Sequence, residues 1–229
     1  MHEVIELLQR KNLIWRGGNV LPTPTTHSTG FSSLDSCLAG GFPRHGVIDV
    51  RSTTGVGELR LLFPYLSACG KQRLVAFIGA PYQINAASLR HSGFDLNQIL
   101  LLSPLSKQDA LWAAEQCLKS GACGAVLLWH QEIEVHQVRR FHMASEIGGC
   151  LQFLLRDSQQ HLASLPVSLS LNVSAHPRGL NIDVLKRKGG WINKSLLVDM
   201  TGRWPSLTLP ESETRVIPFP LQHTVFGGQ

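Results

Sequence analysis

The sequence has 229 residues, of which 43% are hydrophobic and 16% are charged. A typical globular domain carries about 25% charged residues, and this combination of few charges with ample apolar content excludes an intrinsically disordered chain. No apolar run approaches the roughly 20 residues that a membrane-spanning helix needs. The beginning of the chain lacks the basic start and continuous apolar stretch of a secretion signal. The length fits one domain, or one domain plus tails.

The charged residues and the cysteines indicate a cytoplasmic protein without a metal site. The formal net charge is +5, from 21 basic and 16 acidic residues, which permits an anionic partner without requiring one. Five cysteines occur without a Cys-x-x-Cys pattern, so we expect reduced structural thiols. Neither a His-Glu-x-x-His pattern nor a Cys/His quartet is present, and no metal is expected.

The first element expected in chain order is a short helix over residues 3–11. A stretch rich in proline and threonine follows, and its spacing favours an extended linker. We therefore assign residues 1–26 to an N-terminal helix and linker, and expect the compact part to begin at residue 27.

Strand-sized apolar runs then alternate with helical patterns. Strands are expected at 47–50, 74–78, 99–102, 125–128 and 151–155, and helices from about 57, at 84–91, at 106–120 and at 132–147. Ser106 is a suitable helix cap, and Gly121 a suitable stop. Such alternation predicts an α/β fold with a mostly parallel sheet flanked by helices.

The pattern changes near the end of this region. Residues 169–175 and 180–185 alternate apolar and polar side chains around a turn at 176–179, which predicts an antiparallel edge hairpin. Beyond Gly190 the chain contains several prolines and reads as irregular. We therefore assign residues 27–190 to the core and residues 191–229 to a C-terminal tail.

A degenerate phosphate-binding loop lies between the first expected strand and its helix. A P-loop reads G-x-x-x-x-G-K-[ST], whereas this chain has Ser52 at the first glycine, and Glu58 and Leu59 at the lysine and hydroxyl positions. Gly57 keeps the second glycine, and Gly55 lies inside the loop. A carboxylate about 4 Å from a phosphate repels it by about 1 kcal/mol in bulk water, and by more at lower dielectric. Nucleotide binding in the usual P-loop mode is therefore not expected.

Several segments resemble the core of bacterial RecA. They are residues 27–35, 40–46, 93–100 and 109–122. The chain resembles still more closely the ImuA family, which are RecA/SulA-like proteins associated with translesion DNA synthesis. The residues that carry this resemblance are 15–17, 55–60, 110–116, 120–126 and 184–190.

The resemblance implies a RecA-like P-loop-type core that has lost its chemistry. The position of the catalytic glutamate corresponds to Pro81, and that of the metal-side aspartate corresponds to Trp129, followed by His130. Without these groups and the P-loop lysine, nothing would hold Mg²⁺ or activate water. We therefore expect a protein that is not an enzyme and has no cofactor.

By resemblance, the expected function is that of a non-catalytic accessory protein in SOS-induced translesion synthesis and mutagenesis. The implied partners are an ImuB-type Y-family polymerase homologue, an error-prone replicative-type DNA polymerase and RecA itself, with weak DNA contact as an additional expectation. The alternatives are a SulA-like cell division inhibitor that binds FtsZ, and a residual ATPase or DNA-binding motor.

A basic set near the expected hairpin is the candidate contact surface. It consists of Arg178, Lys186, Arg187, Lys188 and Lys194. One interpretation is a solvated edge strand protected by its charge, and the other is a surface for a protein partner or for DNA phosphates. Outside this set, Trp112 is expected to belong to the buried stripe of its helix or to the edge of that stripe.

Overall fold

The computed structural model describes residues 26–158, 164–188 and 194–209. The expected N-terminal helix at 3–11 and most of the expected C-terminal tail lie outside the described residues. No helix in the described ranges is both long and apolar enough to cross a membrane.

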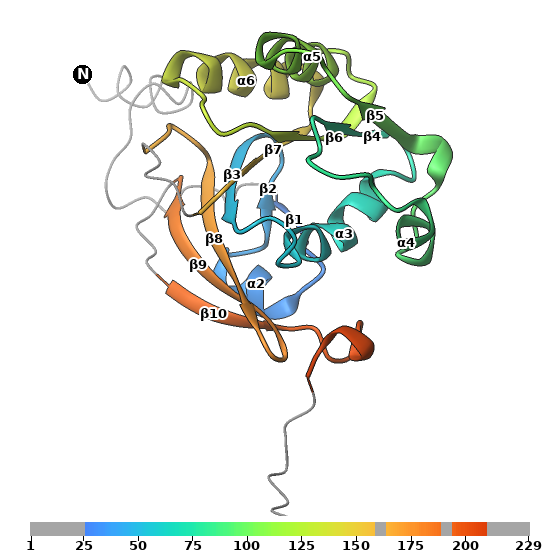
Figure 1. Ribbon diagram of the computed structural model, residues 1–229. Helices are drawn as coiled ribbons and strands as arrows, with labels where there is room; N and C mark the ends of the chain where they lie inside the picture. Colours follow the sequence, from blue (N-terminus) through green and yellow to red (C-terminus); the bar gives the residue numbers. More distant parts are fainter. Residues whose placement is uncertain (1–25, 159–163, 189–193, 210–229) are drawn as a thin grey trace, which may run out of the picture.

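The described chain is built around an eight-stranded sheet with the order β10-β9-β8-β3-β7-β6-β4-β5 (Figure 1). The strands from β8 to β5 in this order run parallel to one another, and β9 and β10 add antiparallel pairs. The strand bounds are β3 (Gly46–Ser52), β4 (Leu74–Ile78), β5 (Ile99–Leu102), β6 (Cys123–Trp129), β7 (Leu151–Arg156), β8 (Leu169–His176), β9 (Gly179–Arg187) and β10 (Lys194–Asp199). A separate two-stranded sheet pairs β1 (Thr26–His27) with β2 (Phe42–Pro43).

Helices cover both faces of the central sheet (Figure 1). One face carries α2 (Ser32–Cys37), α3 (Glu58–Cys69) and α4 (Ala86–His91), and the other carries α5 (Lys107–Lys119) and α6 (Val135–Gly148). Two short 3-10 turns, η1 (Leu96–Gln98) and η2 (Pro205–Leu207), lie outside these layers. Successive strand residues serve opposite layers, because Leu127 packs with the α3 side and Leu128 with the α5 side.

The structure confirms the α/β fold with a mostly parallel sheet flanked by helices. Every strand and helix expected between residues 47 and 185 is present, with bounds that differ by a few residues. The Ser106 hydroxyl accepts a hydrogen bond of 3.0 Å from the amide of Asp109 and caps α5 as expected. Gly121, at φ +71°, ends the turn that follows α5.

The sheet continues past residue 190, where an irregular tail was expected. Residues Lys194–Asp199 form β10, which pairs antiparallel with β9. Val198 and Met200 are fully buried against the core. The hairpin of β8 and β9 exists as expected, but β9 is not an edge strand because β10 covers its outer side. The correction follows from the apolar positions 196, 198 and 200, whose alternation is a strand signal.

Candidate functional site

The degenerate loop lies at the carboxyl end of β3, a central strand of the sheet. Its neighbours β7 and β8 both run parallel to β3, so the carboxyl ends of three strands meet at this edge. In open α/β sheets, ligands bind outside the carboxyl ends of the strands. The loop therefore lies where ligands bind in folds of this kind.

The backbone of the loop retains a phosphate-cradling shape. Gly55 has φ +87°, and Gly57, which caps the N-terminus of α3, has φ +112°. A Cβ atom at position 57 would stand 2.5 Å from the guanidinium of Arg60. The left-handed conformation favours glycine at position 57, whereas the flexible Arg60 side chain could move away from an added Cβ atom.

The carboxylate of Glu58 occupies the amide cradle itself. The Gly55 amide donates a 3.3 Å hydrogen bond to Oε1, and the Gly57 amide donates a 3.1 Å bond to Oε2. Glu58 is only 5% exposed. Amides at a helix N-terminus favour an anion, and here the anion is a side chain of the same chain. The same donors are thus unavailable to a nucleotide phosphate while Glu58 holds them.

Little space remains beside the filled loop. The cavity there has a volume of about 10 Å³, which is about one water probe, whereas small-molecule pockets measure roughly 300–1,000 Å³. Its walls are Ser52, Thr54, Glu58, Trp129, Gln131, Leu155 and Arg156. Leu59, at the hydroxyl position of a P-loop, packs against the hydrophobic core.

The other two expected catalytic positions hold Trp129 and Pro81, which carry no carboxylate. Trp129 ends β6 and stacks on the ring of Phe77, with ring centroids 6.3 Å apart. His130 is buried and its Nε2 has no hydrogen-bond partner. Its burial, together with the positive charge of Lys107, lowers the pKa of His130 below its usual value. Pro81 follows β4 in an exposed bend. Within the described ranges, no group of three metal-ligating side chains gathers.

A buried ion pair that the sequence analysis did not single out lies next to the loop. Arg156 of β7 donates bonds of 2.8 and 2.7 Å to the two carboxylate oxygens of Asp49 in β3. Arg51 and the Ser170 hydroxyl of β8 complete the partners of this carboxylate, at 2.9 and 3.0 Å. Asp49 is fully buried and Arg156 is 4% exposed. A charged Asp49 between the apolar residues Ile48 and Val50 was the signal that could have pointed to this network.

The five residues of the basic set do not form a single patch. Lys186, Arg187 and Lys188 lie at one end of β9, and Lys194 pairs in register with Val184 near that same end. Arg178 lies in the turn before β9, about 26 Å away along the strand, where it forms an ion pair with Asp199 at 2.6 Å.

Lys186 is also partly engaged within the molecule. Its ammonium donates a 2.8 Å hydrogen bond to the carbonyl oxygen of Leu165. The basic residues that remain together at this end of β9 are therefore Arg187, Lys188 and Lys194.

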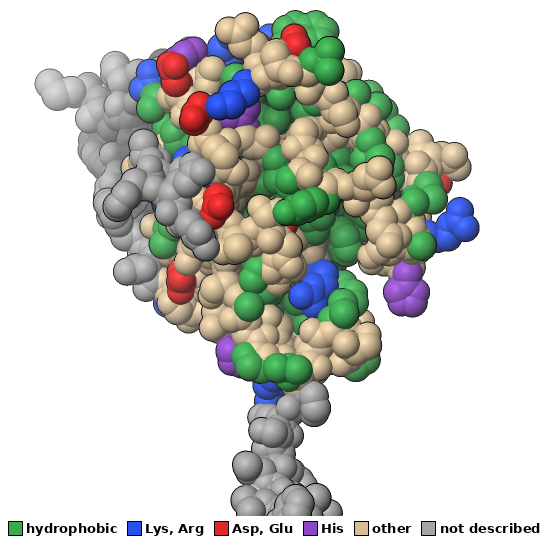
Figure 2. Space-filling model, viewed as in Figure 1, with side chains coloured by type: hydrophobic (Ala, Val, Ile, Leu, Met, Phe, Trp, Pro, Cys, Tyr) green, Lys and Arg blue, Asp and Glu red, His purple; other side chains and the backbone are tan. Residues whose placement is uncertain are grey.

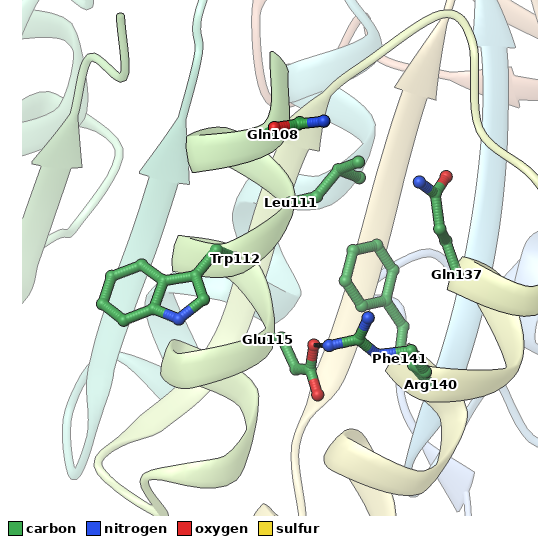
Figure 3. A pocket seen from close by; sticks show the side chains of 7 residues that line it. All are labelled: Gln108, Leu111, Trp112, Glu115, Gln137, Arg140 and Phe141. Carbon is green, nitrogen blue, oxygen red and sulfur yellow. Dashed lines mark hydrogen bonds and ion pairs between the residues drawn. The ribbon is translucent and has the colours of Figure 1, made fainter. Parts of the chain in front are cut away.

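A second concave feature lies between α5 and α6, on the face of the sheet opposite α3 (Figure 3). Its volume is about 280 Å³, and it is lined by Gln108, Leu111, Trp112, Glu115, Gln137, Arg140 and Phe141. Trp112 is 64% exposed, so it is not part of the buried stripe, and Figure 3 shows its ring pointing from α5 away from Arg140 and Phe141 of α6.

An ion-pair network crosses this groove. The Glu115 carboxylate accepts a 2.6 Å hydrogen bond from Lys119 and another from Arg140 of α6. Burial alone would raise the pKa of Glu115, but these two bonds lower it below its usual value. Glu115 therefore stays ionised and ties α5 to α6.

Comparison with known proteins relates the chain to RecA. It is 27% identical over 121 residues to RecA of Acinetobacter baumannii, which covers 52% of this chain and 35% of that protein. RecA of Desulforapulum autotrophicum is 29% identical over 103 residues (44% and 30% of the two chains), and RecA of Oceanobacillus iheyensis is 24% identical over 130 residues (56% and 38%). The chain thus spans about a third of the length of the RecA proteins that it matches.

Two further comparisons complete this result. No protein-family model matches the chain. The crystal structure of SulA from Pseudomonas aeruginosa aligns with 48% of this chain and 97% of its own, at 23% identity and a TM-score of 0.42. The sequence relationship and the strand arrangement together indicate a RecA-like core.

Proposed function

We propose that this chain is a non-catalytic RecA-like accessory protein of SOS-induced translesion DNA synthesis. It would act in a mutasome by docking to an ImuB-type Y-family polymerase homologue, to an error-prone replicative-type DNA polymerase and to RecA. In this account the sheet and its helices are a scaffold for partner surfaces, and the loop after β3 no longer serves ATP chemistry.

The observation that carries this proposal is the Glu58 carboxylate in the loop. It accepts hydrogen bonds from the amides of Gly55 and Gly57, at 3.3 and 3.1 Å. A nucleotide phosphate would have to displace a buried anion that is already bonded, and would then lie beside it. The loop therefore favours a structural role, and the cavity of about 10 Å³ beside it supports the same interpretation.

The relationship to RecA supports the choice of pathway. RecA similarity covers 44–56% of the chain in the three comparisons above. A protein that keeps this core but places a carboxylate in the loop is suited to bind the same partners as RecA. It is not suited to catalyse the ATP reaction of RecA. The closer resemblance to the ImuA family supplies the translesion partners.

Co-purification tests the proposal. The tagged full-length protein is expected to retain the ImuB-type protein encoded in the same genome through a high-salt wash. An Arg187→Ala/Lys188→Ala/Lys194→Ala variant tests the basic end of β9, and Lys71→Ala/Arg90→Ala provides a control elsewhere on the surface. Recovery of neither the ImuB-type protein nor the polymerase would contradict the proposal.

Two additional measurements separate the alternatives. Overexpression is expected to leave cell division normal, and filamentous cells would instead indicate a division inhibitor that acts on FtsZ. A labelled single-stranded oligonucleotide tests direct DNA contact. Binding that falls steeply with salt and is lost in the triple variant would assign the basic end of β9 to DNA phosphates.

A further inference from the structure

Two cysteine side chains meet where the chain turns from α5 into β6, on one face of the central sheet. Cys117 lies in the last turn of α5, and Cys123 is the first residue of β6. Both side chains pack in the apolar cluster between the sheet, α5 and α6, and the two thiols hydrogen-bond each other. Both are free thiols. The structure therefore contains a dithiol at this junction.

The turn that joins the two cysteines is fixed at both of its ends. The Ser120 hydroxyl donates a 2.8 Å hydrogen bond to the carbonyl oxygen of Cys117 and accepts a 3.1 Å bond from the amide of Ala122. The carbonyl oxygen of Ala122 in turn accepts a 2.9 Å bond from the amide of Leu74, at the start of β4. A disulfide tolerates only a narrow range of backbone separations. This turn holds the two backbones so that the thiols stay in contact.

The surroundings of the pair favour a thiolate. The hydrogen bond from Cys117 is the largest influence on Cys123. Together with the Ser120 hydroxyl and the charge of Arg73, it outweighs burial and lowers the pKa of Cys123 to about 7. The remaining proton is held between the two sulfur atoms, which raises the pKa of Cys117 above its usual range. Near neutral pH the pair therefore carries one thiolate, which is the reactive form of cysteine.

Two further thiols lie beside the pair but stay protonated. A Cβ atom on Gly124 would stand 3.1 Å from the Sγ atom of Cys69, so this thiol packs against the backbone next to Cys123. The Cys150 thiol donates a 3.6 Å hydrogen bond to the carbonyl oxygen of Leu118. Burial raises the pKa of Cys69 to about 11 and that of Cys150 to about 12. Neither thiol is therefore a nucleophile at neutral pH.

Solvent reaches the pair through Cys117. This side chain is partly exposed, whereas Cys123 is only 2% exposed. A dissolved oxidant therefore meets the sulfur atom of Cys117 first, and Cys123 is the buried thiol that lies ready behind it. Reactive cysteines of redox-sensitive proteins commonly combine an accessible sulfur with a second cysteine beside it.

We propose that Cys117 and Cys123 form a site of reversible oxidation, at which a peroxide converts the two thiols into an intramolecular disulfide. The site would respond to the oxidation state of its surroundings, and a small thiol would restore the reduced pair. This inference goes beyond the proposed function and does not depend on it, because it rests only on the contacts of the two cysteines.

The reaction is a two-step exchange at sulfur. Transfer of the shared proton along the hydrogen bond to Cys123 places the thiolate on Cys117. This thiolate attacks one oxygen of hydrogen peroxide: the S–O bond forms, the O–O bond breaks, and the departing hydroxide takes the proton of Cys123 and becomes water. The Cys123 thiolate then attacks the Cys117 sulfur: the S–S bond forms, the S–O bond breaks, and hydroxide leaves. Both sulfur atoms are oxidised, and both peroxide oxygens are reduced.

Peptide mapping of the full-length protein after treatment with hydrogen peroxide at neutral pH tests the proposal. The remaining thiols are alkylated in denaturant, and trypsin then cleaves after Lys119, between the two cysteines. The disulfide would join two tryptic peptides that dithiothreitol separates. We expect Cys117 and Cys123 to lose their free thiols in equal amounts, about tenfold faster than Cys37, which is also partly exposed.

Several results of this mapping would overturn the proposal. One is oxidation of Cys117 while Cys123 remains a free thiol, and another is a disulfide to Cys69 or Cys150. A disulfide-linked dimer on a non-reducing gel would assign Cys117 to contact with a second chain instead. Loss of the Cys37 thiol at the same rate as the pair would show that the pair has no special reactivity.

A matched pair of serine variants tests the order of the two steps. Cys117→Ser removes the accessible sulfur atom, and we expect Cys123 to keep its free thiol at peroxide concentrations that oxidise the wild type. Cys37→Ser is the control and should form the Cys117–Cys123 disulfide as the wild type does. Equally rapid oxidation of Cys123 in Cys117→Ser would overturn the assignment of Cys117 as the attacking sulfur. Circular dichroism verifies that both variants are folded.

Discussion

At the scale of residues, the buried ion pair of Asp49 and Arg156 is stable only if its charged atoms all have hydrogen-bond partners. Its two hydrogen bonds join β3 to β7, and the Ser170 hydroxyl adds a link to β8. Removing water from both charges is costly, and the pair is stable only because every oxygen of Asp49 has a partner. One carboxylate therefore holds β3, the strand that leads into the loop, to its two neighbours β7 and β8.

Loss of this carboxylate should destabilise the protein strongly. We expect Asp49→Asn to lower the free energy of unfolding by about 3–5 kcal/mol, because the Arg156 guanidinium would stay buried without its counterion. Ser170→Ala removes one hydrogen bond and should cost about 1 kcal/mol. Urea denaturation measures the free energy of unfolding of both variants. If Asp49→Asn lost no more than the roughly 1 kcal/mol of Ser170→Ala, this role of the ion pair would be contradicted.

His130 should make stability depend on pH. Burial and the charge of Lys107 hold its pKa below the ordinary value of 6.5, so the folded state binds fewer protons than the unfolded state. The stabilisation is then fully present above pH 6.5 and is lost as the pH falls below it. Between about pH 7.5 and pH 5.5, the urea midpoint of the wild type should fall more than that of His130→Gln. Equal falls would contradict the assignment.

At this scale the sequence predicted that the loop lacks the P-loop lysine, but it did not predict where the Glu58 carboxylate would lie. The replacement of lysine by Glu58 can be read directly from the motif. That the carboxylate would turn back onto the Gly55 and Gly57 amides depends on the backbone of the loop and on a side-chain rotamer, which no pattern records. In the same way, Asp49 and Arg156 are 107 residues apart, and only the pairing of β3 with β7 brings them together.

At the scale of elements, the close packing of α5 on α6 depends on one glycine. Gly148→Ala would force a Cβ atom to 1.8 Å from the Leu118 carbonyl oxygen, so the helices must separate. We expect a loss of about 1–3 kcal/mol, as is typical of overpacked sites. Gly202→Ala meets nothing within 4 Å and should be neutral. Thermal unfolding of the two variants measures this loss of stability. An unchanged stability of Gly148→Ala would contradict the prediction, because it would show that the helices can separate at no cost.

The elements divide clearly into those that periodicity predicts and those that it misses. The parallel strands and the helices between residues 47 and 156 follow from alternating apolar runs and caps such as Ser106. β10 was missed because glycines precede it and prolines follow it. Its alternating Leu196, Val198 and Met200 are a signal of only three positions, and the pairing with β9 is long-range information.

At the scale of the whole molecule, β10 belongs to the fold, which a pair of truncations can test. A chain that ends at residue 190 loses β10 and exposes the outer side of β9, whereas a chain that ends at residue 209 keeps both. We expect the shorter chain to aggregate, since a long unpaired edge is prone to self-association. Size-exclusion chromatography and denaturation should find the longer chain monodisperse and cooperative. Equal behaviour of the two chains would place β10 outside the cooperative unit.

The face of the molecule in Figure 2 bears mostly hydrophobic and uncharged polar side chains, with Lys, Arg, Asp and Glu spread across it. The low charge expected from composition is thus visible on this face. What composition could not predict is where the charge matters. The basic set divides between the two ends of β9, and the Glu115 carboxylate, paired with Lys119 and Arg140, links α5 to α6.

The central claim is that an internal carboxylate has replaced the nucleotide phosphate in a RecA-like core. Isothermal titration of the full-length protein with Mg-ATP tests this claim most directly. The account predicts no binding heat at millimolar nucleotide, because Glu58 already holds the amides of Gly55 and Gly57. Saturable binding at micromolar nucleotide would contradict it.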